Sequence, residues 1–275
     1  MFLYFCAFPR SPFFPKPETL SADLHTPEFL AARHASMLAQ TGFVGVDETD
    51  PTGPSGHAYG LRVSSRLTSD YRHRLRRGIV DVTPQEVIDC MIQAKIKNWV
   101  LMGLHGYVGY LPMPRATQDV DVMVPYSEKE RATKAVATRW PMLQQVTLSQ
   151  VVRFLDPSDV DADGKPKPVV DIMLPWGKYQ KSILEKHVIV DKETGSRYPT
   201  IEAALVSKYG ALVSPHRSKE KKEQDSVDFR RMVRANQATI NREKLSELGN
   251  EVWEQGGEEI QRFMDLTMQG KPLPL

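Results

Sequence analysis

The chain has 275 residues, of which 41% are apolar and 25% charged, a balance that is typical of globular proteins and excludes fibrous and wholly disordered classes. Its 36 Lys and Arg nearly cancel its 34 Asp and Glu, so the net charge is +2 and only a local basic patch could hold nucleic acid. The two cysteines, Cys6 and Cys90, are too few for a disulfide framework or a Cys-rich zinc site, which predicts a reducing, cytoplasmic location.

The first 80 residues contain few recognisable elements, and we interpret residues 1–80 as an irregular N-terminal extension. Residues 1–15 are apolar, but three prolines interrupt them and they lack the basic segment of a signal peptide. No apolar run approaches the about 20 residues that cross a bilayer, so we expect no membrane partner. Residues 27–40 could form a helix, whereas residues 41–60 indicate a loop. The basic cluster Tyr71–Arg77 indicates either a solvated helix end or a patch that contacts phosphate or RNA.

Regular structure is expected from about residue 81. Thr83-Pro84-Gln85-Glu86 is a capping box with proline at the first helical position, which predicts a helix over residues 84–96. Residues 98–102 are typical of a buried strand. That strand leads directly into Gly103-Leu104-His105-Gly106.

The next predicted strand, over residues 115–124, alternates apolar and polar side chains. Because side chains on a strand point alternately to its two faces, the polar members gather on one face and the valines on the other. The polar face holds Thr117, Asp119 and Asp121, and the apolar face holds Val120, Val122 and Val124.

The remaining elements complete an α/β (α+β) fold. Ser127 and Glu130 form a second capping box, which predicts a further helix. Strands are expected over residues 147–155 and 168–174, joined by the polar turn Asp156–Lys167. A short helix, a hairpin and then four helices should follow, over residues 176–186, 188–199, 200–213, 223–235, 240–250 and 257–268. We therefore predict a mixed β-sheet with flanking helices over residues 81–199 and a helical C-terminal region over residues 200–275.

Three aspartates stand out against these apolar strands. Asp119 and Asp121 lie two residues apart, roughly 6–7 Å along a strand, so their carboxylates can converge on one ion. Paired carboxylates beside valines repel each other and are costly to desolvate, and a cation such as Mg²⁺ or Mn²⁺ compensates for both effects. Asp171 lies in the apolar segment PVVDIML and also needs a partner. If the two strands are neighbours, three carboxylates meet and can hold two metals about 3.5–4 Å apart, as in phosphoryl displacement.

At this point the sequence resembles a known family, the nucleotidyltransferase superfamily that shares the fold of DNA polymerase beta. Its nearest likeness is to the minimal, AbiE-toxin-like or uncharacterised branch. The resemblance covers about residues 83–235. It is carried by Gly103, the run Arg115-x-Thr117-x-Asp119-Val-Asp121, the third acid Asp171, the later Lys208, and the run Lys222-x-x-Asp225-x-x-Asp228.

The resemblance implies an enzyme that uses Mg²⁺ or Mn²⁺ to move an NMP from an NTP to an acceptor hydroxyl. RNA, such as tRNA, or a protein is the implied acceptor, and a small antitoxin is an implied partner. Asp119 and Asp121 would bind the metal that holds the triphosphate, and Asp171 would complete a second metal site and help activate the attacking hydroxyl.

The resemblance also implies a set of residues around the nucleotide. Gly103 would let the backbone approach the phosphates, Arg115 and Thr117 would orient the acids or touch phosphate, and Lys208 would contact the triphosphate. The family pattern has Gly-Ser at the glycine turn, whereas this chain has Gly103-Leu104-His105-Gly106. His105 is therefore either a substitute phosphate donor or an ordinary packed or surface histidine.

Other interpretations of these residues stay open. The three acids could form a buried salt-bridge cluster in a catalytically inactive fold that binds a nucleotide or a partner, or they could belong to a sugar-nucleotide glycosyltransferase, which needs a larger nucleotide-binding domain. The run Asp159-x-Asp161-x-Asp163-Gly164 mimics a calcium loop, but Val170 replaces the required glutamate, which favours a hairpin turn. The basic residues 216–222 form either a solvated helix face or a surface for an acceptor such as tRNA.

Overall fold

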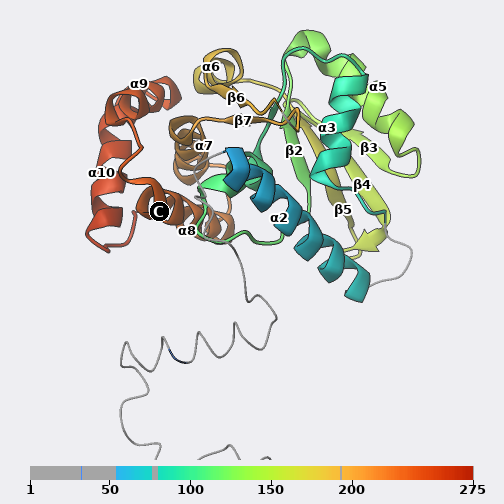
Figure 1. Cartoon of the computed structure of the whole chain (residues 1–275), viewed down its shortest axis with the longest axis horizontal. Coiled ribbons are helices and arrows are strands. Elements are labelled where there is room, and N and C mark those ends of the chain that lie inside the picture. Colours follow the sequence, from blue (N-terminus) through green and yellow to red (C-terminus); the bar gives the residue numbers. More distant parts are fainter. Residues whose placement is uncertain (1–31, 33–53, 76–79, 193, 275) are drawn as a thin grey trace, which may run out of the picture. The chain divides into compact units, whose positions relative to one another are not determined.

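The computed structural model describes residues 32, 54–75, 80–192 and 194–274 (Figure 1). The helix expected over residues 27–40 lies outside the described residues, apart from Ala32, which is helical. The chain divides into two units, Met1–Thr49 and Asp50–Leu275, and the helices and strands below belong to the second.

Helix α2 spans Pro54–Leu75, so the loop expected over residues 41–60 is wrong in its last part, and the extension is not irregular throughout. Short 3₁₀ turns at Val108–Tyr110 and Tyr126–Glu128 separate some of the later elements. The other helices and strands are α3 (Pro84–Gln93), β1 (Val100–Leu101), α4 (Gly103–Tyr107), β2 (Val120–Met123), α5 (Lys129–Arg139), β3 (Gln144–Thr147), β4 (Val151–Val160), β5 (Pro166–Met173), α6 (Lys178–Lys186), β6 (Val188–Val190), β7 (Arg197–Pro199), α7 (Ile201–Val213), α8 (Lys219–Asn236), α9 (Arg242–Val252) and α10 (Gly256–Met268).

The two predicted capping boxes have different outcomes. At α3 the box is confirmed, because Thr83 Oγ1 accepts a bond from the Glu86 amide at 3.2 Å and the Glu86 carboxylate accepts one from the Thr83 amide at 3.0 Å. At α5 the box is wrong. The 3₁₀ turn takes up Ser127, so the helix begins after Glu128 and no side chain caps it.

The main sheet has the strand order β1-β2-β5-β4-β3, with β2 and β5 parallel and the other pairs antiparallel. This mixed sheet with helices confirms the predicted α/β class. The sequence does not predict β3, and β4 and β5 are longer than expected, which leaves residues 161–165 as the turn. There, Asp161 Oδ1 accepts bonds from the amides of Asp163 and Lys165, both at 2.9 Å, so the hairpin interpretation of the calcium-like run is confirmed.

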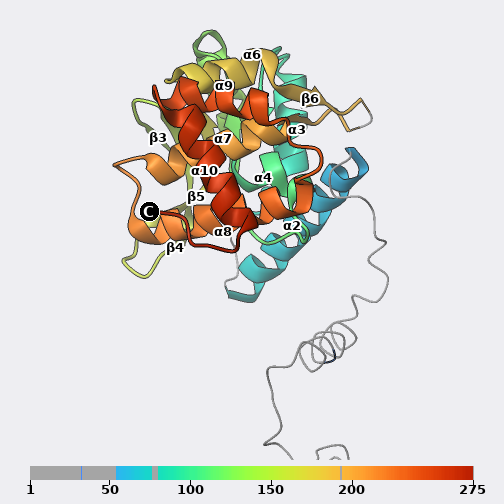
Figure 2. The ribbon, with the colours of Figure 1, turned by 90° about the vertical axis from the view of Figure 1, so that its left-hand side faces the viewer.

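Each face of the sheet packs against a different set of helices. Helices α3 and α5 cover one face (Figure 1), where an apolar core includes the predicted valines of β2 together with Val152, Phe154, Val170 and Ile172. The C-terminal helices pack on one another (Figure 2) and form a second core with residues such as Met123. The alternation in β2 therefore directs Asp121 toward this second side. Within the described residues, no helix is both long and apolar enough to cross a membrane.

In the basic cluster predicted at residues 71–77, Tyr71 and His73 are exposed, whereas Arg72 is built into the fold. Arg72 is buried and forms ion pairs with Asp156 at 3.2 Å and Asp159 at 3.7 Å. It is therefore neither solvated nor free to contact phosphate, and it ties α2 to the far end of β4. Asp159, from the calcium-like run, also pairs with Lys167 at 2.9 Å.

Candidate active site

The three predicted acids meet on one face of the sheet. Asp119 directly precedes β2, Asp121 lies within it, and the parallel register of β2 and β5 places Asp171 beside Asp121. Carboxylate oxygens of all three residues lie within 4.8 Å of one another. The predicted convergence of the acids is thus confirmed, with Asp171 buried and the other two half-buried.

The electrostatics of this cluster are unfavourable to three full negative charges. Burial, followed by the charges of Asp119 and Asp171, raises the pKa of Asp121 well above its usual range. Burial and Asp171 likewise raise the pKa of Asp119, although Thr117 Oγ1 donates a hydrogen bond to it at 3.4 Å. Converging carboxylate oxygens are the ligands that hard divalent cations prefer, so the donor set fits Mg²⁺ or Mn²⁺.

Gly103 lies beside this cluster, and its lack of a side chain matters for the acids as well as for the approach to phosphate that the resemblance implies. It begins α4 with a φ of +53°, a conformation that glycine adopts readily and other residues rarely do. A Cβ atom at this position would collide with the carboxylate of Asp121. The missing side chain therefore makes room for the acid itself.

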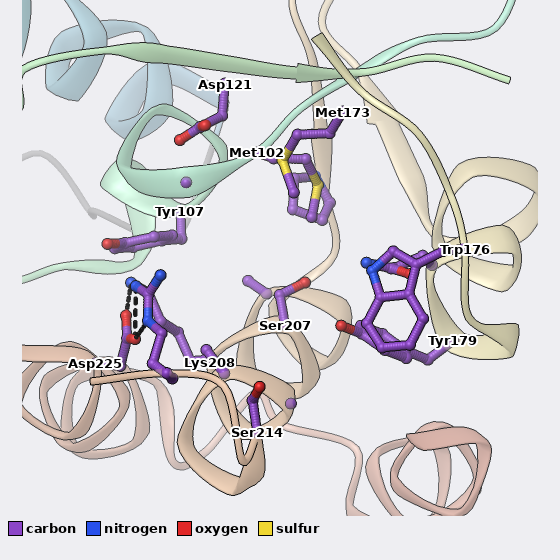
Figure 3. Close-up of a pocket in the computed structure, with 17 residues that line it drawn as sticks. Met102, Tyr107, Asp121, Met173, Trp176, Tyr179, Ser207, Lys208, Ser214 and Asp225 are labelled. Carbon is purple, nitrogen blue, oxygen red and sulfur yellow. Dashed lines mark hydrogen bonds and ion pairs between the residues drawn. The ribbon is translucent and has the colours of Figure 1, made fainter. Parts of the chain in front are cut away.

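A cavity of about 330 Å³ opens beside Asp121 (Figure 3). Asp121 lines it from β2, and Lys208 lines it from α7 on the opposite side. Gly103, at the start of α4, also lines it. Trp176 and Tyr179 line a third side, and the Trp176 side chain is 57% exposed. The cavity is at the small end of the range for ligand sites, which begins at about 300 Å³.

Lys208 reaches the cavity from within a network of ion pairs. Its Nζ donates to Asp225 Oδ1 at 2.7 Å, lies 3.2 Å from Asp228 Oδ2, and stands 4.6 Å from the centre of the Tyr107 ring. Burial disfavours the charged ammonium, but Tyr107, Asp225 and Asp228 outweigh it and raise the pKa of Lys208. The lysine is therefore a fixed positive charge facing the acids.

The structure places Arg115 in this same network. Its Nη2 lies 2.9 Å from Asp228 Oδ2, and the Tyr107 hydroxyl donates to the same oxygen at 2.7 Å. Arg217 pairs with Asp225 at 2.8 Å. Burial would raise the pKa of Asp228, but Lys208, Arg115 and Tyr107 together hold it below its usual value. Arg115 thus orients Asp228 rather than the three acids.

His105 does not line the cavity. It is 3% exposed, and neither ring nitrogen has a hydrogen-bond partner in the part of the chain that the structure describes. Its carbonyl accepts a bond from His57 Nε2 at 2.8 Å, and the His57 ring stacks on Tyr198 with centroids 3.7 Å apart. This placement matches the packed-histidine interpretation, and it leaves the glycine turn without a side-chain phosphate donor at that position.

One residue that touches the acids is not predicted from the sequence. Arg153, on β4, donates from Nε to Asp171 Oδ1 at 2.9 Å and from Nη2 to Asp171 Oδ2 at 2.5 Å. A signal for it exists, since Arg153 interrupts the apolar strand segment Val-Val-Arg-Phe-Leu. Tyr107 and His57 were missed too, and no local pattern marks either of them.

No family model and no curated protein matches the chain. Among solved structures, the chain is similar to an antigenic nucleotidyltransferase-like protein from Paracoccidioides brasiliensis, with 14% identity and a TM-score of 0.42 over 69% of this chain and 92% of that one. It is similar to the Megavirus polyadenylate synthase, with 13% identity and a TM-score of 0.37 over 69% and 44% of the two chains.

A third similar structure is ANT(2″)-Ia in complex with adenylyl-2″-tobramycin, with 13% identity and a TM-score of 0.37 over 59% of this chain and 90% of that one. The likenesses are distant, and the geometry of this chain's own acids carries the functional case.

Proposed function

We propose that the protein is a metal-dependent nucleotidyltransferase that moves an NMP from an NTP to an acceptor hydroxyl. The observation that carries the proposal is the convergence of Asp119, Asp121 and Asp171 within 4.8 Å, at a cavity with a fixed lysine on its other side. The charge of Asp171 raises the pKa values of Asp119 and Asp121, and a divalent cation would stabilise their charged forms. A cation held in this way suits a phosphate-bearing substrate.

In this proposal, Asp119 and Asp121 hold the metal. A bound divalent cation would neutralise phosphate charge and align the phosphoryl group for in-line displacement. Lys208 is positioned by Asp225 and Asp228 to meet the triphosphate from the opposite wall. The exposed face of Trp176 offers a stacking surface for the base at the cavity's side.

The resemblance extends this proposal to the acceptor, which is a hydroxyl of RNA or of a protein. On the same resemblance, we propose that the protein has a small antitoxin as a partner and acts in the cytoplasm. Lys219 and Lys221, at the start of α8, are exposed and lie just beyond Arg217, which lines the cavity. They offer a local basic surface to an RNA acceptor.

A second candidate is a catalytically inactive nucleotide- or partner-binding module. One observation favours it specifically: Asp171, the acid that would help activate the acceptor, is engaged by Arg153 through both carboxylate oxygens. In this case the cavity would bind nucleotide without transferring it.

Labelling separates the two candidates. The full chain is incubated with each NTP labelled at the α-phosphate, with Mg²⁺ or Mn²⁺, and with total RNA or cell protein as acceptor. We expect metal-dependent label on one acceptor class, lost in the Asp119→Asn/Asp121→Asn variant and retained in Asp163→Asn, an exposed acid of the hairpin turn. Nucleotide binding without label transfer would support the inactive module instead. Absence of both binding and transfer would overturn the nucleotide site.

A further inference from the structure

The strand register places three charged residues in one row across the sheet. Asp121 on β2 is paired with Asp171 on β5, and Asp171 is paired on its other side with Arg153 on β4. Directly paired residues on neighbouring strands point to the same face, so the row reads acid, acid, base. Asp171 is therefore the acid that has a repelling neighbour on one side and an attracting neighbour on the other.

The contact between Arg153 and Asp171 is bidentate. Arg153 Nε donates to Oδ1 at 2.9 Å and Nη2 donates to Oδ2 at 2.5 Å, so both carboxylate oxygens are engaged. The Arg153 side chain is 37% exposed, whereas that of Asp171 is 6% exposed. The guanidinium thus reaches the buried acid from the solvent side, in the fork geometry that suits a carboxylate.

Asp119 and Asp121 have no comparable partner. In the part of the chain that the structure describes, no Lys, Arg or His lies within ion-pair distance of either carboxylate, and Lys208 is committed to the acids of α8. The positive charge built into the cluster is therefore concentrated at Asp171. A cation bound there would have to break a charge-assisted bidentate pair, whereas a cation bound between Asp119 and Asp121 would break none.

We propose that Arg153 is a positioning residue that takes the place of a second metal, so that the site binds one divalent cation, between Asp119 and Asp121. The inference rests on the proposed function through its metal site, and it goes beyond it in setting the number of metals. Three carboxylates and one guanidinium leave two negative charges, which one divalent cation balances. Asp171 then stays with Arg153 while the metal is bound.

Counting bound Mn²⁺ on the full chain tests this proposal. Mn²⁺ is titrated into the protein, alone and with an NTP analogue that cannot be cleaved at the α-phosphate, and the free ion is measured by electron paramagnetic resonance. We expect one site in the wild-type protein, two in Arg153→Met, which keeps the stem but loses the charge, and one in Arg153→Lys, which restores the charge. The matched control is Arg139→Met, an exposed arginine of α5 paired with Glu86.

The outcomes distinguish this inference from the function on which it rests. Two sites in the wild type, or the same number in wild type and Arg153→Met, would overturn the role of Arg153 and leave the metal site standing. No Mn²⁺ bound by either protein would overturn both proposals. Thermal melts of each variant, without metal and with added Mn²⁺, provide a second measurement. Without metal, Arg153→Met should melt at a lower temperature than Arg153→Lys, and added Mn²⁺ should raise the melting temperature of Arg153→Met by more.

Discussion

Two groups of aspartates face each other across the cavity, and their electrostatics are opposite. On the strand side, burial and mutual repulsion raise the pKa values of Asp119 and Asp121. On the helix side, Asp228 is completely buried, yet its pKa is lowered. The residue type is the same, so the difference comes from partners alone.

The helix-side group is complete within the protein. Asp228 forms ion pairs with Arg115 and Lys208 and accepts a hydrogen bond from the Tyr107 hydroxyl. Asp225 forms ion pairs with Lys208 and Arg217. The strand-side group has one cation in ion-pair contact among the described residues, Arg153. A complete group serves to hold Lys208 in place, whereas an incomplete one is suited to bind a charge from outside.

The largest expected effect comes from breaking the complete group. Asp228→Ala leaves Arg115 without its buried partner and leaves Lys208 with Asp225 alone. Removing one member of a buried ion pair costs about 3–5 kcal/mol. Denaturation by urea should show this loss in the free energy of unfolding. Asp163→Ala is the control, because that acid is exposed and its pairing with Lys165 contributes about 0–1 kcal/mol. A variant at Asp228 as stable as this control would show that the network does not hold the fold.

The acid cluster shows how far the sequence could lead. Alternation in β2 correctly predicts which residues face the apolar core, and Asp171 is recognisable as a charge in an apolar strand. The sequence does not contain the register that sets Arg153 beside Asp171, because that depends on strand order. Lys208 was identified by resemblance, but its two partners lie 17 and 20 positions further along the chain, and only packing of α7 against α8 brings them together.

The wrong predictions for α2 and for the start of α5 have a similar cause. Helix α2 begins in a segment rich in glycine and proline, and its position depends on contacts such as that of Arg72 with Asp156, 84 residues away. The capping box at Thr83 was correct because it is purely local. The one at Ser127 failed because a 3₁₀ turn takes up the same residues.

The second-largest effect is a pH dependence of stability that comes from two buried histidines outside the two aspartate groups. Burial lowers the pKa of His57 to about 4 and that of His105 to about 3. Both are below the unfolded value of about 6.5, so the unfolded chain binds more protons and stability falls as pH falls below about 6.5. The loss from about pH 7 to about pH 5 should be about 2 kcal/mol for each histidine.

Urea denaturation at the two pH values measures this effect. The His105→Leu variant loses no side-chain hydrogen bond that the described structure shows, and it should remove about half of the pH dependence that the two histidines contribute. The acid cluster acts in the opposite direction, because raised pKa values make the folded state relatively more stable at low pH. Stability that rises from pH 7 to pH 5 in the wild type would show that the acids dominate and the histidines do not.

The third effect probes the close contact between Gly103 and the acid cluster. Gly103→Ala must adopt a positive φ and place a Cβ against the Asp121 carboxylate, which should cost about 1–3 kcal/mol. In an Asp121→Ala background the collision is relieved and only the backbone cost remains. A double-mutant cycle measured by urea denaturation should therefore give a coupling energy of about 1 kcal/mol. Zero coupling would mean that the glycine is needed for its backbone conformation alone.

The smallest effect has the opposite sign and decides between the two interpretations of the acids. Asp121→Asn removes a negative charge from a repelling cluster without changing its shape, so the metal-free protein should gain up to about 1 kcal/mol of stability. The same change should abolish stabilisation by Mn²⁺, which in the wild type should approach about 2.7 kcal/mol at a hundredfold excess over the dissociation constant. Thermal melts with and without Mn²⁺ measure both quantities, and Asp228→Asn is the matched control because it should lose stability with and without metal. If Asp121→Asn also loses stability without metal, the strand-side acids are satisfied within the protein, and the inactive binding module becomes the better account of the site.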